Sequence, residues 1–248
     1  RQLRAFLPLF SMFLFASVVA NAASFRLAVD AGIAFNTVND VRIPGDTGTK
    51  FSIADDLDVK PAFASRIRLS AFINDNHEFS MLLAPLTLLA DGRAPADIDF
   101  DGETFPAGTD LNARYMFNSW RIGWRYYWTA DGDPLTLGLG FTAKIRDAAV
   151  EVIGGGARAT NTNVGFVPLL SFCVRYELPG GWSLLLDGDA LAGPQGRAED
   201  VFIGVERRIH ETATARFGYR ILEGGADNDT VYAFALLHFV VMGLDLRF

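Results

Sequence analysis

The sequence predicts an all-β fold: a transmembrane antiparallel up-and-down β-barrel of ten strands, with eight or twelve strands as alternatives. Three observations predict it. The chain is 50% hydrophobic, yet no internal apolar run reaches the roughly 18 residues that a membrane helix needs. Apolar and polar side chains alternate with a period of two along the chain, as they do in β-strands. The connections between alternating segments are short at one end and long at the other, which is the asymmetry of membrane barrels.

The N-terminal segment stands apart from this alternation. Arg1 and Arg4 precede an apolar stretch that ends in an Ala-Asn-Ala triplet at 20–22. A positively charged start, an apolar stretch and a small-x-small triplet are typical of a secretory signal peptide. We therefore assign residues 1–22 to a signal peptide and residues 23–248 to one barrel domain. An N-terminal membrane anchor is the alternative.

The first expected strand shows the alternation most clearly. In residues 24–36 the odd positions from Phe25 to Phe35 are apolar, and Arg26 and Asp30 lie among the even ones. Because successive side chains of a strand point to opposite faces, one face is apolar and the other is polar. The same pattern places further strands at 62–74, 77–89, 111–128, 135–146, 164–177, 182–191, 199–209, 213–221 and 230–248.

The expected strand at 111–128 changes parity in its middle. Up to Phe117 the odd positions are apolar, and after Ser119 the even positions are apolar. A β-bulge near Asn118 and Ser119 would shift the parity by one residue. A tight hairpin is the alternative, but it would make the strand number odd and place the two termini on opposite sides. We therefore predict a bulge.

Antiparallel order sorts the connections into two groups. The short ones, expected on the periplasmic side, are 74–76, 129–134, 179–181 and 209–212. The long ones, expected on the extracellular side, are 37–61, 90–108, 147–163, 193–198 and 223–229. This difference in length is the one that outer-membrane barrels show between their two sides.

With this topology, aromatic side chains that face lipid collect at both ends of the strands, where lipid meets water. At the periplasmic ends they are Phe25, Phe79, Tyr126, Trp128, Tyr176, Trp182 and Phe248. At the extracellular ends they are Phe35, Phe63, Tyr115, Phe166, Tyr219 and Tyr232. A secreted soluble barrel or sandwich with its apolar faces turned inward is the alternative, and it would leave these two aromatic groups unexplained.

The last strand ends in Leu246, Arg247 and Phe248. Together with the signal peptide and the alternating strands, this closing aromatic resembles a bacterial outer-membrane β-barrel protein. In size and style the chain is similar to outer membrane protein W and to outer membrane protein A-type barrels, which have eight strands. The resemblance implies a place in the outer membrane, among lipid and lipopolysaccharide. It also implies that Phe248 is the signal by which the barrel-assembly machinery recognises the chain.

Charged side chains occupy the faces that should point into the lumen, and basic ones outnumber acidic ones. The lumen-lining candidates are Arg66, Arg68, Arg121, Arg125, Lys144, Arg146, Asp187, Asp189, Glu206, Arg216 and Arg220. Narrow barrels fill with side chains, and the arginine fork suits ion pairing. We therefore expect a largely closed, salt-bridged lumen and a structural or interaction role. Glu206 and Asp200 are the expected partners of Arg216 and Arg220. A narrow anion-biased channel or small-solute pore is the alternative.

The long connections carry acidic clusters. Asp97, Asp99 and Asp101 match the start of a calcium-binding EF-hand loop, but Gly108 stands where that loop needs a glutamate. We predict no metal site there. Weak binding of a divalent cation near lipopolysaccharide phosphates is the only metal role that these three carboxylates suggest.

Little in the sequence suggests an enzyme, and we expect neither catalysis nor a cofactor. His77 and His210 fall at periplasmic turns, and His238 falls within a strand, on its lipid face. The segment around His77 lacks the His-x-Ser spacing of lipid A deacylases. A lipid-directed outer-membrane enzyme is therefore a second alternative only.

Two further features of the chain limit its possible disulfides and partners. The single cysteine, Cys173, allows no internal disulfide, and a formal charge of −7 argues against a nucleic-acid partner. The sequence carries no signal for an oligomeric state.

Overall fold

The period-two segments are strands in the structure, a computed structural model that describes residues 24–193 and 196–248. The long strands are β1 (Ser24–Arg42), β4 (Ala62–Ile73), β5 (His77–Ala84), β6 (Thr87–Arg93), β9 (Asp110–Thr129), β10 (Leu135–Gly154), β11 (Ala157–Leu178), β12 (Trp182–Gly193), β13 (Gly196–His210), β14 (Ala213–Asp227) and β15 (Tyr232–Arg247). The signal peptide assigned to residues 1–22 lies outside the described residues. Within the described ranges, no helix has the length and apolar character needed to cross a membrane.

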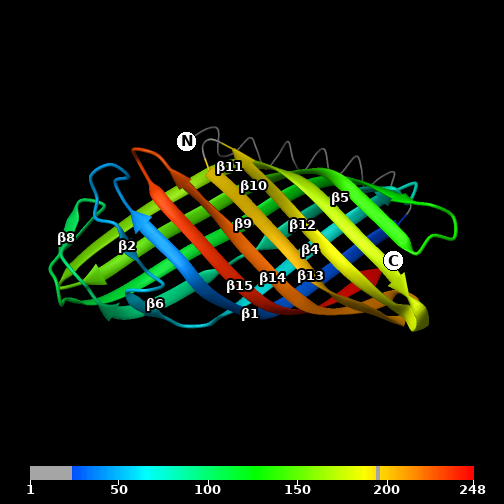
Figure 1. Cartoon of the computed structure of the whole chain (residues 1–248), viewed down its shortest axis with the longest axis horizontal. Helices are drawn as coiled ribbons and strands as arrows, with labels where there is room; N and C mark the ends of the chain where they lie inside the picture. The colour runs from blue at the N-terminus through cyan, green and yellow to red at the C-terminus, as the bar shows by residue number, and fades with distance from the viewer. Residues whose placement is uncertain (1–23, 194–195) are drawn as a thin grey trace.

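Hydrogen bonds join these strands into a closed antiparallel ring (Figure 1). β1 pairs with β15 on one edge and with β4 on the other, so the first and last strands close the barrel. β5 and β6 share one position beside β9, separated by Pro85 and Leu86. Counted as one, they give the ten strands that the sequence predicts, and the alternatives of eight and twelve are wrong.

The two ends of the barrel differ. Every connection is short at the end where the chain also finishes, and the two long connections, 43–61 and 94–109, lie at the other end (Figure 1). Following the asymmetry of membrane barrels, we call these the periplasmic and the extracellular end.

β9 runs without a bulge, so the bulge predicted near Asn118 and Ser119 is wrong. The pairing of β9 with β10 is continuous through both residues. The odd residues of β9 point inward along its whole length, because Leu111 and Tyr115 near one end and Arg121 toward the other are all buried. The switch of parity therefore has a cause other than a change of backbone register.

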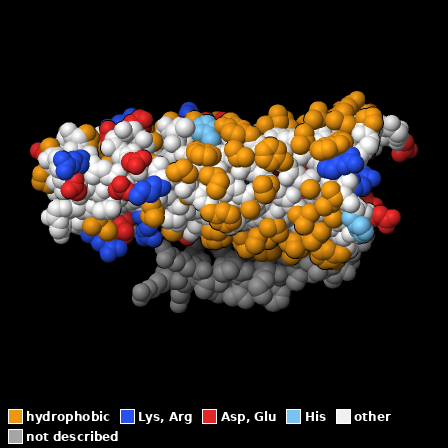
Figure 2. All heavy atoms as spheres, turned by 90° about the horizontal axis from the view of Figure 1, so that it is seen from below, with side chains coloured by type: hydrophobic (Ala, Val, Ile, Leu, Met, Phe, Trp, Pro, Cys, Tyr) orange, Lys and Arg blue, Asp and Glu red, His pale blue; other side chains and the backbone are white. Residues whose placement is uncertain are grey.

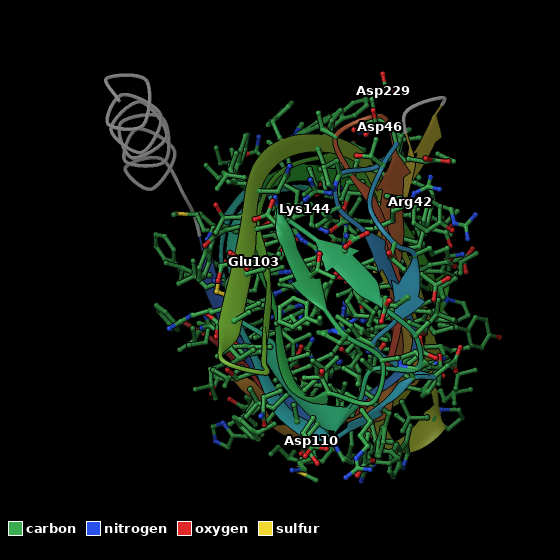
Figure 3. All side chains as sticks on the ribbon, turned by 90° about the vertical axis from the view of Figure 1, so that its left-hand side faces the viewer. Arg42, Asp46, Glu103, Asp110, Lys144 and Asp229 are labelled. Atoms are coloured by element: carbon green, nitrogen blue, oxygen red, sulfur yellow. The ribbon has the colours of Figure 1, made fainter. Side chains whose placement is uncertain are left out.

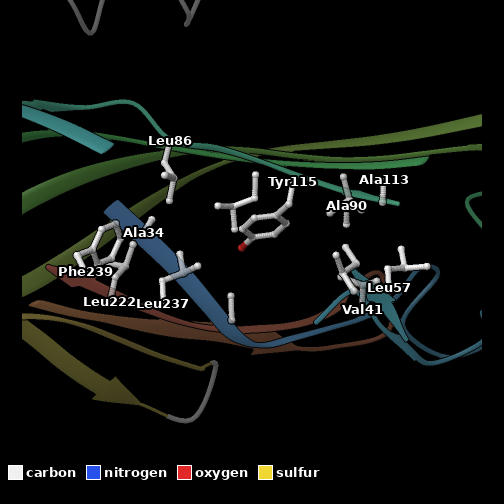
Figure 4. Close-up of a cluster of buried hydrophobic side chains, with 14 of the residues drawn as sticks. Ala34, Val41, Leu57, Leu86, Ala90, Ala113, Tyr115, Leu222, Leu237 and Phe239 are labelled. Atoms are coloured by element: carbon white, nitrogen blue, oxygen red, sulfur yellow. The ribbon is translucent and has the colours of Figure 1, made fainter. Parts of the chain in front are cut away.

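That cause is an inversion of polarity along the barrel. In the periplasmic half, inward side chains are charged and outward ones are apolar, as in a barrel that spans lipid. In the extracellular half, inward side chains form an apolar cluster (Figure 4). Tyr115 points into this cluster rather than toward lipid (Figure 4). Its fully buried members on the long strands include Val41, Leu88, Leu111, Val152 and Leu237.

Short strands of the long connections cover the extracellular end. β2 (Phe51–Ser52) pairs with β1, and β3 (Leu57–Val59) pairs with β6. The hairpin of β7 (Ile98–Phe100) and β8 (Glu103–Phe105) lies across the mouth of the ring (Figure 3). Phe100 and Phe105 are fully buried, so the hairpin is held by packing inside the barrel.

Three predicted loops, 147–163, 193–198 and 223–229, consist mostly of the ends of long strands. The sequence predicts a loop at 147–163, but β10 continues to Gly154 and β11 begins at Ala157. Gly155 and Gly156 form the turn with positive φ angles of 58° and 86°, a region that glycine adopts without strain. The alternation of this hairpin is hard to see in the sequence, because both of its faces contain small or polar residues.

Exposed apolar side chains form a belt over the periplasmic part of the barrel, whereas the extracellular end is polar with mixed charges (Figure 2). Aromatic residues lie exposed toward both ends of the belt. They are Phe35, Phe63, Phe166 and Tyr219 toward one end and Trp128, Tyr176, Trp182 and Phe248 toward the other. The placement of Tyr115 in the extracellular group is wrong, because no bulge turns it outward.

Candidate functional site

The centre of the lumen is built around one buried carboxylate. Asp200 of β13 is 2% exposed. It accepts hydrogen bonds from Arg66 at 2.7 Å and from Arg121 at 2.5 Å. Arg220 donates to its other oxygen at 2.7 Å. Three guanidinium groups from three different strands therefore meet on Asp200.

A second carboxylate lies directly beside it. Asp189 of β12 is the register partner of Asp200, and two carboxylates placed opposite each other on neighbouring strands repel. Arg121 resolves this repulsion, since it donates to Asp189 at 2.6 Å as well as to Asp200. The hydroxyl of Thr142 also donates to Asp189, at 2.8 Å. Arg121 belongs to β9, which is not a neighbour of β12 or β13 in the ring, so these bonds cross the lumen.

A second group of ion pairs lies nearer the periplasmic end. Arg125 donates to Asp187 at 2.6 Å, and Arg68 lies 3.5 Å from the same carboxylate. Glu78 is paired with Arg26 and accepts a hydrogen bond from Tyr127 at 2.6 Å. These contacts join β4, β5, β9 and β12 across the lumen.

Arg216 and Arg175 are paired with carboxylates along the wall. Arg216 lies 2.6 Å from Asp30 and 3.3 Å from Asp245. Glu206 binds Arg175 at 2.8 Å. The expected pairing of Arg220 with Asp200 is present, but the bonds of Arg216 go to Asp30 and Asp245 instead of Glu206. β1 and β15 thus supply carboxylates that the sequence-based pairing left out.

Hydroxyl groups complete this network, and the sequence analysis missed them. Ser70 donates to Glu78 at 2.6 Å, and Arg125 donates to Ser171 at 2.7 Å. Both serines are buried. The signal that could have found them is their parity, because each occupies an inward position on a strand that also carries an inward arginine.

The cavities around these ion pairs are small. The largest has a volume of about 40 Å³ and is lined in part by Arg66, Arg121 and Arg220. Two others, of about 10 Å³ each, lie beside Arg125 and Arg216. A single water needs roughly 10–15 Å³, so each of these cavities holds a few waters at most.

Two of the lumen candidates lie outside this network, toward the extracellular end. Lys144 lies inside the ring of strands (Figure 3) and is 2% exposed. Its Nζ atom is 4.8 Å from the centre of the Phe117 ring. Arg146 donates to the side chain of Asn163. Neither cation forms an ion pair within the described ranges.

The three loop carboxylates considered for a divalent cation have separate hydrogen-bond partners. Asp97 accepts from the backbone of Ala107, and Asp99 accepts from Thr104. Asp101 accepts from Asn161 of β11. In the part of the chain that the structure describes, no three His, Cys, Asp or Glu side chains are grouped to hold a metal ion. The carboxylates instead fix the β7–β8 hairpin.

The histidine on the outer face has hydroxyl partners. The Nε2 atom of His238 lies 2.7 Å from the hydroxyl of Thr37, and its Nδ1 atom is hydrogen-bonded to Tyr219. Thr37 stands at the one register shift between β1 and β15. These contacts satisfy both ring nitrogens at the edge of the apolar belt.

No protein-family model and no curated protein matches the sequence. Solved structures do match it. The chain is similar to the outer membrane protease OmpT of Escherichia coli, with a TM-score of 0.53 and 8% identity over 92% of this chain and 97% of that one. Lower TM-scores relate it to the translocator domain of autotransporter NalP from Neisseria meningitidis (0.44, 12% identity, covering 100% and 98%) and to Neisserial surface protein A (0.37, 15%, covering 91% and 99%). The likeness to OmpT shows a shared fold.

The chain is a β-barrel of the bacterial outer-membrane type. The ring is closed, its strand number is even, and apolar side chains cover its outside where charged ones fill its inside. Only a lipid environment makes that inside-out arrangement stable. The prediction that this barrel lies in the bacterial outer membrane is confirmed.

Proposed function

We propose that this barrel is a non-conducting outer-membrane protein with a structural or interaction role. The observation that carries the proposal is the set of bonds from Arg121 across the lumen to Asp189 and Asp200. These bonds join opposite walls at a level where the neighbouring cavity, of about 40 Å³, holds a few waters at most. An ion that crossed the barrel would have to break them.

Breaking such a buried network costs several kcal/mol. Removing one partner of a buried ion pair leaves the other charged and desolvated, at about 3–5 kcal/mol. Arg121, Asp189 and Asp200 are each at most 5% exposed, so water does not replace the lost bonds. The apolar cluster and the β7–β8 hairpin obstruct the same path a second time at the extracellular end.

Conductance in a planar bilayer tests the proposal. We expect wild-type barrel to give no steady current. The variant Arg121→Ala opens the space between Asp189 and Asp200 and should give a leak, whereas Lys60→Ala, which removes an exposed cation at the extracellular end, should stay silent. Heat-modifiable migration in gels selects folded protein for all three. A large, anion-selective wild-type current would overturn the proposal in favour of a channel.

We also propose that the barrel has no catalytic role. Within the described ranges His238 contacts no carboxylate, and an acid is the usual group that orients a catalytic histidine. Its two nitrogens bond hydroxyl groups, which accounts for a polar ring at the edge of the belt. Incubation of wild type with phospholipid and lipid A should release no fatty acid. Release by wild type that is lost in His238→Asn would show the opposite.

We propose that the partners of this protein are the lipids that surround an outer-membrane barrel and the machinery that assembles it. Outer-membrane lipid and lipopolysaccharide surround the apolar belt. The barrel-assembly machinery reads the final strand and its Phe248. The acidic extracellular connections face the phosphates of lipopolysaccharide.

A further inference from the structure

The wall of the barrel has an unpaired edge near its extracellular end. β11 pairs with β10 from Ala157 to Tyr176. On its other edge it pairs with β12 only between Leu170 and Leu178. Among the residues that the structure describes, the segment 157–169 therefore has no strand partner on that edge. Pro168 stands at the end of the paired region, as expected for a residue that lacks a backbone N–H and is tolerated at strand edges.

A chamber of about 400 Å³ lies beside this edge. Its volume falls in the range of small-molecule sites, about 300–1,000 Å³. It is bounded by Asn163 and residues 165–168 of β11 on one side and by Leu191, Gly193 and residues 196–198 on the other. The chamber thus spans the place where β11 and β12 separate.

Apolar side chains mark the opening toward lipid. Phe166 is 63% exposed, Val164 is 56% exposed and Leu191 is 39% exposed. Phe166 and Leu191 also line the chamber. The same side chains therefore belong both to the outer apolar belt and to the chamber, so the chamber opens sideways toward the lipid.

The inner wall of the chamber is cationic. Its lining contains Lys144, Arg146 and Arg197, and it contains no carboxylate within the described ranges. Arg197 is neutralised by Glu223. Lys144 and Arg146 have no such partner, and Lys144 is the register partner of Arg121, a further cation. Like charges on paired strands destabilise a sheet.

These two cations have unused hydrogen-bonding capacity. Lys144 makes no hydrogen bond or ion pair within the described ranges, and its Nζ atom lies over the Phe117 ring. The Nε atom of Arg146 is buried without a partner. A buried cation without a counter-ion is costly, and an anion bound between the two would remove that cost.

Apart from Asn161, Asn163 and Tyr115, the rest of the lining is apolar or glycine, and much of it is small. It includes Ala148, Gly165, Ala198, Gly224 and Ala233. Such residues leave room for an apolar chain and offer it no hydrogen bonds. A free inorganic anion could bind the two cations, but it would leave this apolar surface uncovered. A neutral hydrocarbon could cover the apolar surface, but it would leave the cations unpaired.

We propose that this chamber binds a single-chain amphiphile with an anionic head group. The head lies between Lys144 and Arg146, and the chain leaves between β11 and β12 into the outer leaflet. This is a binding role that the closed lumen below the chamber does not provide. Carboxylate and phosphate head groups both supply the negative charge and the hydrogen-bond acceptors that Lys144 and Arg146 require.

Photo-crosslinking in neutral detergent micelles tests the site. The probe is dodecanoate carrying a diazirine on its chain, and the matched neutral probe is the corresponding dodecanol. We expect the carboxylate probe to label β11 and β13 peptides that contain residues 163–168 and 196–198. The alcohol should label the same peptides about tenfold less, because it lacks the charge-assisted bonds. Unlabelled dodecanoate and dodecyl phosphate compete in separate arms, and the stronger competitor identifies the head group.

Three variants distinguish binding of the probe in the chamber from nonspecific binding to the apolar belt. Lys144→Met keeps the length of the side chain and should lower the labelling about tenfold. Ala198→Phe fills the chamber and should lower it as well. Lys60→Met removes a lysine outside the chamber and should leave labelling unchanged. Heat-modifiable migration shows that each variant is folded. Labelling spread evenly over the belt, equal for both probes and unaffected by Lys144→Met, would overturn the proposal.

Discussion

At the scale of single residues, Asp200 holds the lumen together. One carboxylate accepts hydrogen bonds from Arg66, Arg121 and Arg220. Each of those arginines is buried or nearly so, and arginine keeps its charge under all ordinary conditions. The three charges therefore depend on Asp200 for their compensation more than on any other residue.

Replacing this carboxylate gives the first prediction. Asp200→Asn keeps the shape and removes the charge, which should lower the free energy of unfolding by about 3–5 kcal/mol. Denaturant unfolding in micelles, followed by tryptophan fluorescence, measures the change. Glu103→Gln is the matched control, because Glu103 is exposed on the β7–β8 hairpin. A variant as stable as this control would show that the arginines do not rely on Asp200.

At the scale of elements, β9 shows what the sequence can and cannot reveal. Its extent is predicted within a residue at each end, because the alternation of apolar and polar positions is strong. The predicted bulge is wrong, since the alternation inverts when the surroundings inside and outside the barrel exchange polarity. The sequence reports the polarity of each face but cannot say whether the backbone or the environment has changed.

The direction of Tyr115 gives a second prediction. It is 6% exposed among apolar residues of the extracellular half. Tyr115→Ala should therefore lower the free energy of unfolding by about 3 kcal/mol or more, as truncations of buried aromatic residues do. Asn112→Ala, on the exposed face of the same strand, should have little effect in the same denaturant experiment. Equal effects of the two variants would instead support the predicted bulge and a Tyr115 side chain that points outward.

The same limit applies to the pairing of charges in the lumen. Parity identifies the inward face of a strand, and Arg66, Arg220 and Glu206 all lie there. Which arginine meets which carboxylate depends on contacts across the lumen, and these follow from strand tilt and register. The bonds of Arg216 to Asp30 and Asp245 could not be read from the sequence for this reason.

At the scale of the whole molecule, the terminal residue closes the ring. Phe248 and Phe25 exchange backbone hydrogen bonds, and their rings stack at a centroid distance of 6.0 Å. The side chain of Phe248 is nonetheless 69% exposed, so little of its surface contributes to the stability of the finished barrel. An exposed terminal aromatic is available to another protein during assembly.

The third prediction separates these two roles of Phe248. If Phe248 is the assembly signal that we propose, Phe248→Asp should lower the folded fraction in cells, measured by heat-modifiable migration. Purified denatured protein should refold into micelles with a yield close to that of wild type, because the exposed ring adds little to stability. A loss in both experiments would make the effect structural, and no loss in cells would show that the residue is dispensable.

The orientation of the barrel follows from the lengths of its connections and gives the last prediction. Asp99 lies on the hairpin at one mouth, Asp227 lies at the end of β14 on the same side, and Asp131 lies in the short turn between β9 and β10. All three are exposed, and the native Cys173 is buried, so single cysteines can be introduced against a low background. A membrane-impermeant maleimide should label Asp99→Cys and Asp227→Cys on intact cells. Asp131→Cys should react only after the outer membrane is permeabilised, because it faces the periplasm. Labelling of Asp131→Cys alone on intact cells would place the acidic connections and the β7–β8 hairpin inside the cell envelope.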